Sequence, residues 1–204
     1  MRRIAVIVLA LALAVSALST TQSFGAAAPT LTPTQADKRF VDRTLNSLCG
    51  RIDDSRTVRH PSLGTATVGL RRLSGSQTGH GCVAASGPAG QKLLVQQVYV
   101  YGNELSFASP AQDATSNVFV IYNPGRYNGV MTLVPNTSGY QDIGWGSADR
   151  PFRDTTHAYY WVELLGPGAD GRYAIKQYDN TCEPNCAGGQ VTTKILRWNG
   201  QRYT

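Results

Sequence analysis

Residues 118–134 decide the fold class: Val-Phe-Val-Ile-Tyr-Asn-Pro-Gly-Arg-Tyr-Asn-Gly-Val-Met-Thr-Leu-Val. The run Val118–Tyr122 is continuously apolar, as expected of a central strand that is covered on both faces. The next four residues fit a type II turn, with Pro124 at the second position and Gly125 at the third, where a positive φ is needed. Residues 127–134 then return as a second strand. This stretch predicts an antiparallel hairpin inside a β-sheet.

Segments on both sides of this hairpin also have strand composition: 65–73, 93–101, 105–108, 158–165, 172–178 and 191–198. No segments with helical periodicity alternate with them, which argues against a βαβ fold and favours successive antiparallel hairpins. Two stretches rich in Gly, Pro, Ser and Asp, residues 74–91 and 136–156, are expected to be long irregular segments.

One helix is expected ahead of the strands, over residues 35–49. Four apolar residues recur there at helical spacing and give the segment one apolar face: Phe40, Val41, Leu45 and Leu48. The sequence therefore predicts a mainly β fold for residues 34–204, a single antiparallel β-sheet or sandwich-like domain with one N-terminal amphipathic helix.

The start of the chain has the pattern of a secretory leader. Two Arg follow Met1, residues 4–18 are apolar except for Ser16, and small residues follow, so we expect a cleaved signal peptide over 1–26 and a linker over 27–33. The apolar run is short for a membrane span, which needs about 20 residues. No Cys lies near the expected cleavage site. We expect a secreted or extracytoplasmic protein without a lipid anchor.

Composition indicates a folded chain with a basic excess. The 204 residues are 42% hydrophobic and 16% charged, with 19 Lys and Arg against 13 Asp and Glu. The Arg-rich region 38–72 could contact an anionic surface, although a solvated face is the common alternative. Nucleic acid is not an expected partner of an exported chain without a nucleic-acid-binding motif. We expect a monomer.

The chain has an even set of cysteines, Cys49, Cys82, Cys182 and Cys186, which predicts two disulfides in an oxidising compartment. Four cysteines allow three pairings. The short spacing of the last two suits a local clip in a hairpin connection, and the first two would then tie the helix to the next part of the chain. A zinc site is the alternative, but no further His or Cys lies near the last pair. No metal or cofactor is expected.

Five aromatic residues form the candidate binding site: Tyr140, Trp145, Phe152, Tyr159 and Trp161. Aromatic rings on a Gly-rich segment beside an aromatic strand can stack on sugars, peptides or apolar ligands. The alternative is a small hydrophobic core beneath the segment. The leading hypothesis is a non-enzymatic binding or cell-envelope protein whose ligand or envelope partner is unknown.

Two other functions stay open, because no catalytic motif specifies a reaction and enzymatic activity is undecided. A secreted hydrolase could use Glu163 or His157 as its acid or base, although a carboxylate paired with Arg is the structural alternative for Glu163. A secreted inhibitor could present the Cys-containing segment 179–189 to a partner. That hypothesis predicts a protruding, rigid loop.

Two segments carry a resemblance to a known family. The stretch 118–130 resembles a part of the LppP/LprE-type exported proteins, in which a strand leads into an aromatic–turn–Gly–x–Tyr–x–Gly–Thr unit. The tail from Asp179 to Gly200 is similar to that family's close, where a strand ends in Arg-Trp-x-Gly. Val130 stands where the pattern has Thr, and the leader lacks a lipidation Cys. The resemblance implies an exported cell-envelope protein without an established activity, and it supplies no catalytic residues.

Overall fold

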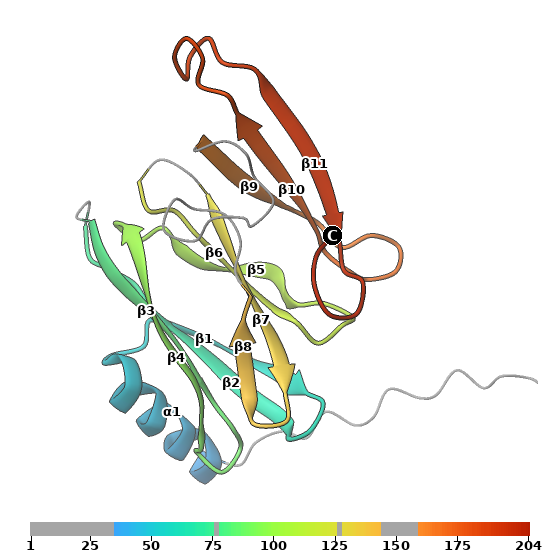
Figure 1. The fold of residues 1–204 in the computed structure, drawn as a ribbon. Helices are drawn as coiled ribbons and strands as arrows, with labels where there is room; N and C mark the ends of the chain where they lie inside the picture. Colours follow the sequence, from blue (N-terminus) through green and yellow to red (C-terminus); the bar gives the residue numbers. More distant parts are fainter. Residues whose placement is uncertain (1–34, 76–77, 126–127, 144–158) are drawn as a thin grey trace, which may run out of the picture. The chain divides into compact units, whose positions relative to one another are not determined.

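The structure is a computed structural model that describes residues 35–75, 78–125, 128–143 and 159–204, with side chains described from Lys38 onward and, in the last segment, from Trp161. These residues belong to one unit, Pro33–Thr204. The described elements are α1 (Gln35–Cys49), β1 (Asp54–His60), β2 (Gly64–Arg71), β3 (Thr78–Ser86), β4 (Lys92–Tyr101), β5 (Leu105–Gln112), β6 (Val118–Tyr122), β7 (Gly129–Asn136), β8 (Gly139–Asp142), β9 (Tyr159–Leu165), β10 (Ala174–Asn180) and β11 (Val191–Arg197) (Figure 1).

The first sheet has the order β1-β2-β3-β4 and carries α1 on one face. Val41, Leu45 and Cys49 recur every four residues, so they lie on one side of the helix. They pack against Cys82 and Ala84 of β3, whose small side chains let the helix approach the sheet. The helix expected over 35–49 is confirmed, but Phe40, which was predicted on its apolar face, is half exposed and lies outside this cluster.

The second sheet, in the order β5-β6-β7-β8, packs against the other face of the first and against a third sheet. Val118, Val120 and Tyr122 of β6 lie in the core shared with the first sheet, whereas Phe119 lies in the core shared with the third. The continuous apolar run therefore belongs to a strand that is covered on both faces, as predicted. Gly125 in the following turn has φ +120°, which confirms the positive φ expected there.

The third sheet has the order β11-β10-β9, and every pairing within the three sheets is antiparallel. Val162, Ile175 and Leu196 point from this sheet toward Phe119 and Val130 of the second sheet. The fold is therefore mainly β, as predicted, and its described strands form three sheets rather than one.

Two disulfides are present, and no described cysteine is free. Cys49 at the end of α1 is bonded to Cys82 in β3, with 5.6 Å between Cα atoms. Cys182 is bonded to Cys186 in the connection between β10 and β11, with 3.7 Å between Cα atoms. The expected pairing is confirmed.

The prediction that residues 74–91 are irregular is wrong, because β3 occupies Thr78–Ser86. Its glycines and alanines resemble loop composition. Small side chains are nevertheless what this strand requires, because Ala84 lies beneath α1 and Ala85 lies in the core on the opposite face. β8 likewise lies within the stretch 136–156 that was expected to be irregular.

Candidate functional site

Tyr140, the first member of the predicted aromatic set, lies in the core between the first and second sheets. Its side chain is 6% exposed, and its ring meets the buried His60 ring edge-on with 5.1 Å between centroids. The Nε2 of His60 donates to the Gly139 carbonyl at 3.0 Å. Burial raises the pKa of the Tyr140 hydroxyl. The structure therefore places Tyr140 in the core, as the packing alternative expects.

Trp161, the last member of the set, lies in a cluster on the outer face of the third sheet. It stacks on its cross-strand partner Tyr178, with ring centroids 4.7 Å apart and an interplanar angle of 4°. The Tyr178 hydroxyl donates to Glu163 Oε2 at 2.7 Å, and the Lys176 Nζ lies 4.7 Å from the Tyr178 ring centroid. A hydrogen bond with Tyr178 raises the pKa of Lys176, and the Glu163 charge adds to this effect. These four residues form the outer-face cluster.

The other predicted site residues lie outside the described part of the structure. These are Trp145, Phe152 and His157, together with the side chain of Tyr159 at the start of β9. Of the five aromatic residues, the structure thus places two side chains. It puts Tyr140 in the first core and Trp161 on the third sheet, so it does not bring these two together.

Glu163, the candidate acid or base, is exposed, and its carboxylate lies beside polar groups of β10. It accepts the Tyr178 hydroxyl and faces Lys176 across the β9–β10 ladder, in place of the Arg that was expected. Among the described residues, no three His, Cys, Asp or Glu side chains gather as metal ligands would. The hydrolase hypothesis for Glu163 or His157 stays a prediction.

A loop connects β10 and β11 at the end of their hairpin (Figure 1). Residues 181–190, which we call the clipped loop, contain the Cys182–Cys186 disulfide. Residues 183–188 are exposed, and none of the core clusters includes a residue of this loop. As far as the described residues go, the loop therefore takes its shape from a disulfide and hydrogen bonds rather than from packing on the core.

One buried amide holds both cysteines of the clipped loop. The Asn180 side chain is 4% exposed and lies at the end of β10. Its Oδ1 accepts from the Cys182 backbone N–H at 2.9 Å, and its Nδ2 donates to the Cys186 carbonyl at 3.0 Å. The backbone of Gly189 lies close to Asn180 and Cys182. A Cβ at position 189 would overlap Asn180 Oδ1 and lie 2.6 Å from the Cys182 nitrogen.

Two further side chains complete the clipped loop. Asn185 Oδ1 accepts from the backbone N–H groups of Ala187 at 3.0 Å and Gly188 at 2.9 Å. The Thr181 hydroxyl accepts from the Gln190 N–H at 3.0 Å, and the Thr181 N–H donates to the Gln190 carbonyl at 3.1 Å. An exposed loop that is cross-linked and hydrogen-bonded in this way can present its outer side chains in one arrangement.

The strand that comes after the clipped loop is exposed on both faces. In β11 only Leu196 is buried, whereas Val191 and Ile195 are each about half exposed. Val191 and Ile195 have the same parity as Thr193, so both apolar side chains lie on one face of the strand.

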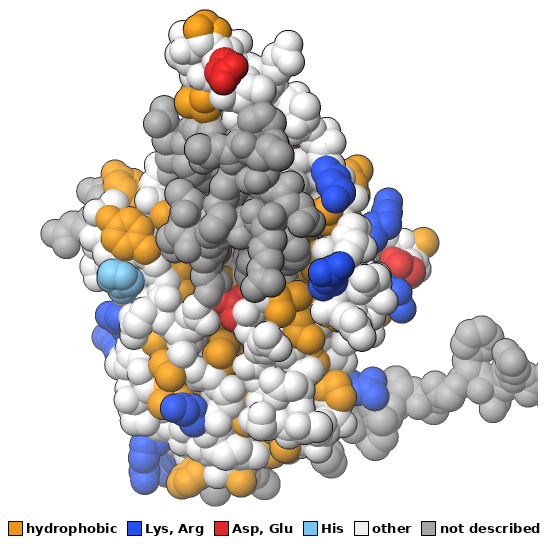
Figure 2. Space-filling view, viewed as in Figure 1, with side chains coloured by type: hydrophobic (Ala, Val, Ile, Leu, Met, Phe, Trp, Pro, Cys, Tyr) orange, Lys and Arg blue, Asp and Glu red, His pale blue; other side chains and the backbone are white. Residues whose placement is uncertain are grey.

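A second apolar surface lies along β4. Val95, Tyr99 and Tyr101 lie on one face of this strand and are each about 40% exposed. His80 of β3 meets Tyr99 edge-on, with 5.4 Å between ring centroids, and Figure 2 shows a His side chain beside hydrophobic ones. This surface was not predicted from the sequence. Its signal is the alternation Val98-Tyr99-Val100-Tyr101, in which the valines are buried and the tyrosines exposed.

Several arginines of region 38–72 have structural roles. The Nε of Arg72 donates to the Leu105 carbonyl at 2.7 Å, and its guanidinium pairs with Asp54 at 3.1 Å. Arg56 pairs with the same carboxylate and lies 5.2 Å from the centre of the Phe107 ring. These two guanidinium groups therefore join the first sheet to β5.

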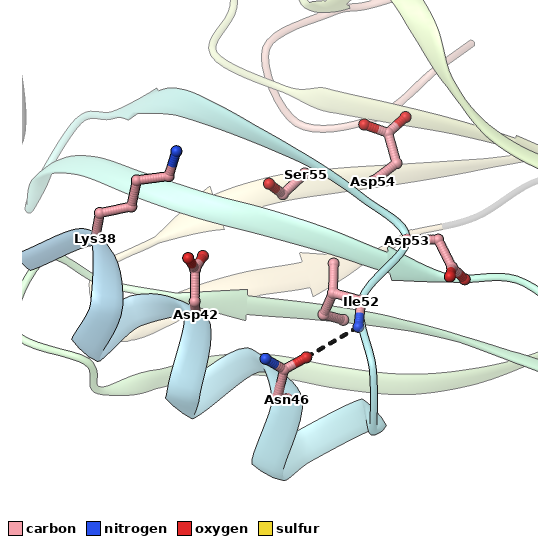
Figure 3. A pocket seen from close by; sticks show the side chains of 7 residues that line it. All are labelled: Lys38, Asp42, Asn46, Ile52, Asp53, Asp54 and Ser55. Carbon is pink, nitrogen blue, oxygen red and sulfur yellow. Dashed lines mark hydrogen bonds between the residues drawn. The ribbon is translucent and has the colours of Figure 1, made fainter. Parts of the chain in front are cut away.

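A hollow of about 390 Å³ lies between α1 and β1 (Figure 3). It is lined by Lys38, Asp42, Asn46, Ile52, Asp53, Asp54 and Ser55. The Asn46 Oδ1 accepts from the Ile52 N–H at 2.9 Å and closes one end. With three carboxylates and one ammonium group, the hollow does not suit an anion. Anionic contact through 38–72 therefore stays a prediction for exposed residues such as Arg39 and Arg43 on the helix.

No family model matches this chain, and no curated protein matches it. Among solved structures, it is similar to a mutant of the GH43 protein BlXynB from Bacillus licheniformis, with 14% identity and a TM-score of 0.27. The match covers 75% of this chain and 29% of that chain. A TM-score of this size does not indicate a shared fold, so we draw nothing about function from it.

Proposed function

We propose that this chain is an exported, disulfide-bonded protein that binds a partner protein through the clipped loop and does not catalyse a reaction. The observation that carries the proposal is the exposed loop 181–190, which is fixed by its own disulfide and by the buried side chain of Asn180. Ordering a loop before binding lowers the entropy cost of the complex. An ordered loop outside the core is thus better explained by recognition than by stability.

The placement of the loop supports the same conclusion. Glu183, Pro184 and Asn185 are exposed at the hairpin end. Asn185 is engaged with its own loop, whereas Glu183 and Pro184 provide a charge and a rigid apolar ring that can reach a partner. The secreted-inhibitor hypothesis, one of the alternatives from the sequence, requires a loop of this kind.

Export is supported by the leader pattern and by the cysteines. Disulfides persist in extracytoplasmic compartments and are rare in the cytosol. Both described disulfides fit that environment. In the described ranges, the structure contains no helix with the length and apolarity that a membrane crossing requires.

The proposal is tested by partner capture with matched variants. The oxidised protein is immobilised, retained envelope or secreted proteins are identified, and the affinity of the purified partner is then measured. We expect Glu183→Lys to weaken binding at least about tenfold, because it reverses the charge at the contact. The double variant Cys182→Ser, Cys186→Ser should weaken it further by freeing the loop.

The control is Asp170→Lys, a charge reversal at the opposite end of β10, where the carboxylate is 63% exposed. It should leave the affinity unchanged. If no saturable partner is retained, or if the partner binds both loop variants as tightly as the native protein, the proposal fails.

A further inference from the structure

β11 has an open edge. It is the outermost strand of the third sheet, and among the described residues only its last one has a neighbour on the outer side, because Arg197 exchanges two hydrogen bonds of 3.0 Å with Thr204. Backbone groups alternate in direction along a strand. The N–H and C=O groups of Val191, Thr193 and Ile195 therefore point the same way as those of Arg197, away from β10. In Figure 1, no described element lies beside this part of the strand.

This edge lacks the usual protection against strand pairing. Natural edge strands are kept short, bulged, charged or proline-containing, so that they do not pair with other chains. β11 has regular register with β10 over its full length, contains no proline, and is rich in β-branched residues. Lys194 is its one charge before Arg197. Such an edge is suited to accept another strand.

We propose that two copies of this chain pair through β11, antiparallel and edge to edge, about a two-fold axis at Thr193. In this register Thr193 faces its own copy. Val191 of each chain faces Ile195 of the other, and Thr192 faces Lys194. The outward backbone groups at 191, 193 and 195 then meet their counterparts as hydrogen-bonded pairs, which joins two three-stranded sheets into one.

The second copy is favoured as the occupant because this register is self-complementary. It places the two half-exposed apolar side chains, Val191 and Ile195, against each other twice. An axis at Lys194 would instead place two ammonium groups opposite each other, which is destabilising. The C-terminal residue Thr204 limits the pairing at one end, and the clipped loops extend from opposite ends of the joined sheet.

The test is sedimentation velocity of the purified oxidised protein over a concentration series, with variants that change only the edge. We expect twice the monomer mass at high concentration. Thr193→Pro should abolish the dimer, because it removes an outward N–H that the β10 ladder does not use. Thr193→Val keeps that N–H and should still dimerise. Far-ultraviolet circular dichroism checks that both variants fold.

A charge swap tests the register itself. Ile195→Glu alone should raise the dimer dissociation constant about tenfold, because the two-fold axis repeats the loss at two places. Adding Val191→Lys to the same chain should restore the dimer, since each new Lys faces a new Glu. A protein that stays monomeric at millimolar concentration, a dimer that is unaffected by Thr193→Pro, or a failure of the swap to restore pairing would overturn the proposal. These measurements need no partner protein, so their outcome is independent of the proposed function.

Discussion

The two disulfide-bonded regions differ in what surrounds them. Cys49 and Cys82 are 7% and 0% exposed and lie in one cluster with Val41, Leu45 and Ala84. The Cys182–Cys186 bond closes an exposed loop that contributes to none of the described core clusters. The first region is held by packing and by its disulfide together, whereas the second depends on its disulfide and hydrogen bonds alone.

The two disulfides therefore have different effects on the protein. A disulfide across a separation of 33 residues restrains the unfolded chain and thereby stabilises the whole domain. A disulfide across four residues restrains little of the unfolded chain, and its main effect is on the shape of the loop. Variants of the two regions should therefore differ in which property they change, global stability or local order.

The largest expected effect comes from the buried bond. The double variant Cys49→Ala, Cys82→Ala should lower the free energy of unfolding by about 3–4 kcal/mol, because the unfolded chain gains loop entropy. Urea denaturation followed by circular dichroism measures this change. An unchanged denaturation midpoint would show that packing by α1 alone determines the stability of this region.

Packing beneath the buried bond should be the next largest contribution. Leu45 is 1% exposed, so Leu45→Ala leaves a cavity between α1 and the first sheet and should cost about 3 kcal/mol of unfolding free energy. Phe40→Ala on the same helix is the control, because Phe40 is half exposed and should change stability far less. Equal losses from the two variants would contradict the packing derived for α1.

The sequence predicted the buried elements whose pattern is set by their own residues. The helix at 35–49 appears where the spacing of its apolar residues predicts it, because it buries one stripe. The strand Val118–Tyr122 appears where a continuous apolar run predicts it, because it buries both faces. The sequence does not predict β3, because the burial of this strand depends on α1. Its glycines and alanines form a strand only where α1 covers them.

The candidate site was predictable only in part for a similar reason. The spacing of Cys182 and Cys186 indicated a clip, but the role of Asn180 depends on a side chain that turns back under the loop. Composition predicts the aromatic set, but it cannot separate Tyr140, a core ring, from Trp161, an outer-face ring. Distinguishing them requires knowing which face of each strand meets another layer.

The exposed bond gives the third expected effect. The double variant Cys182→Ser, Cys186→Ser should lower the free energy of unfolding by no more than about 2 kcal/mol, because the loop it closes is short. Cleavage within 181–190 should become much faster under limited proteolysis, since the loop can open without unfolding the sheets. Fragment mass spectrometry identifies the cleaved bond. If the variant loop were cleaved as slowly as the native loop, the hydrogen bonds alone would be enough to keep residues 181–190 ordered.

The smallest global effect should come from Gly189→Ala. Its Cβ would overlap Asn180 Oδ1 and approach the Cys182 nitrogen to 2.6 Å, so the Asn180 bridge to the two cysteines must shift. Gly188→Ala is a matched control, because its nearest new contact is an ordinary 3.7 Å to Asn185 Oδ1.

We expect Gly189→Ala to change the free energy of unfolding by less than about 1 kcal/mol while accelerating amide hydrogen exchange at Cys182, whose N–H then loses its acceptor. Gly188→Ala should leave that exchange rate unchanged. If the Gly189 variant destabilised the whole domain as strongly as the Leu45 variant, the clipped loop would be part of the cooperative core. The contrast between the two disulfide regions would then be wrong.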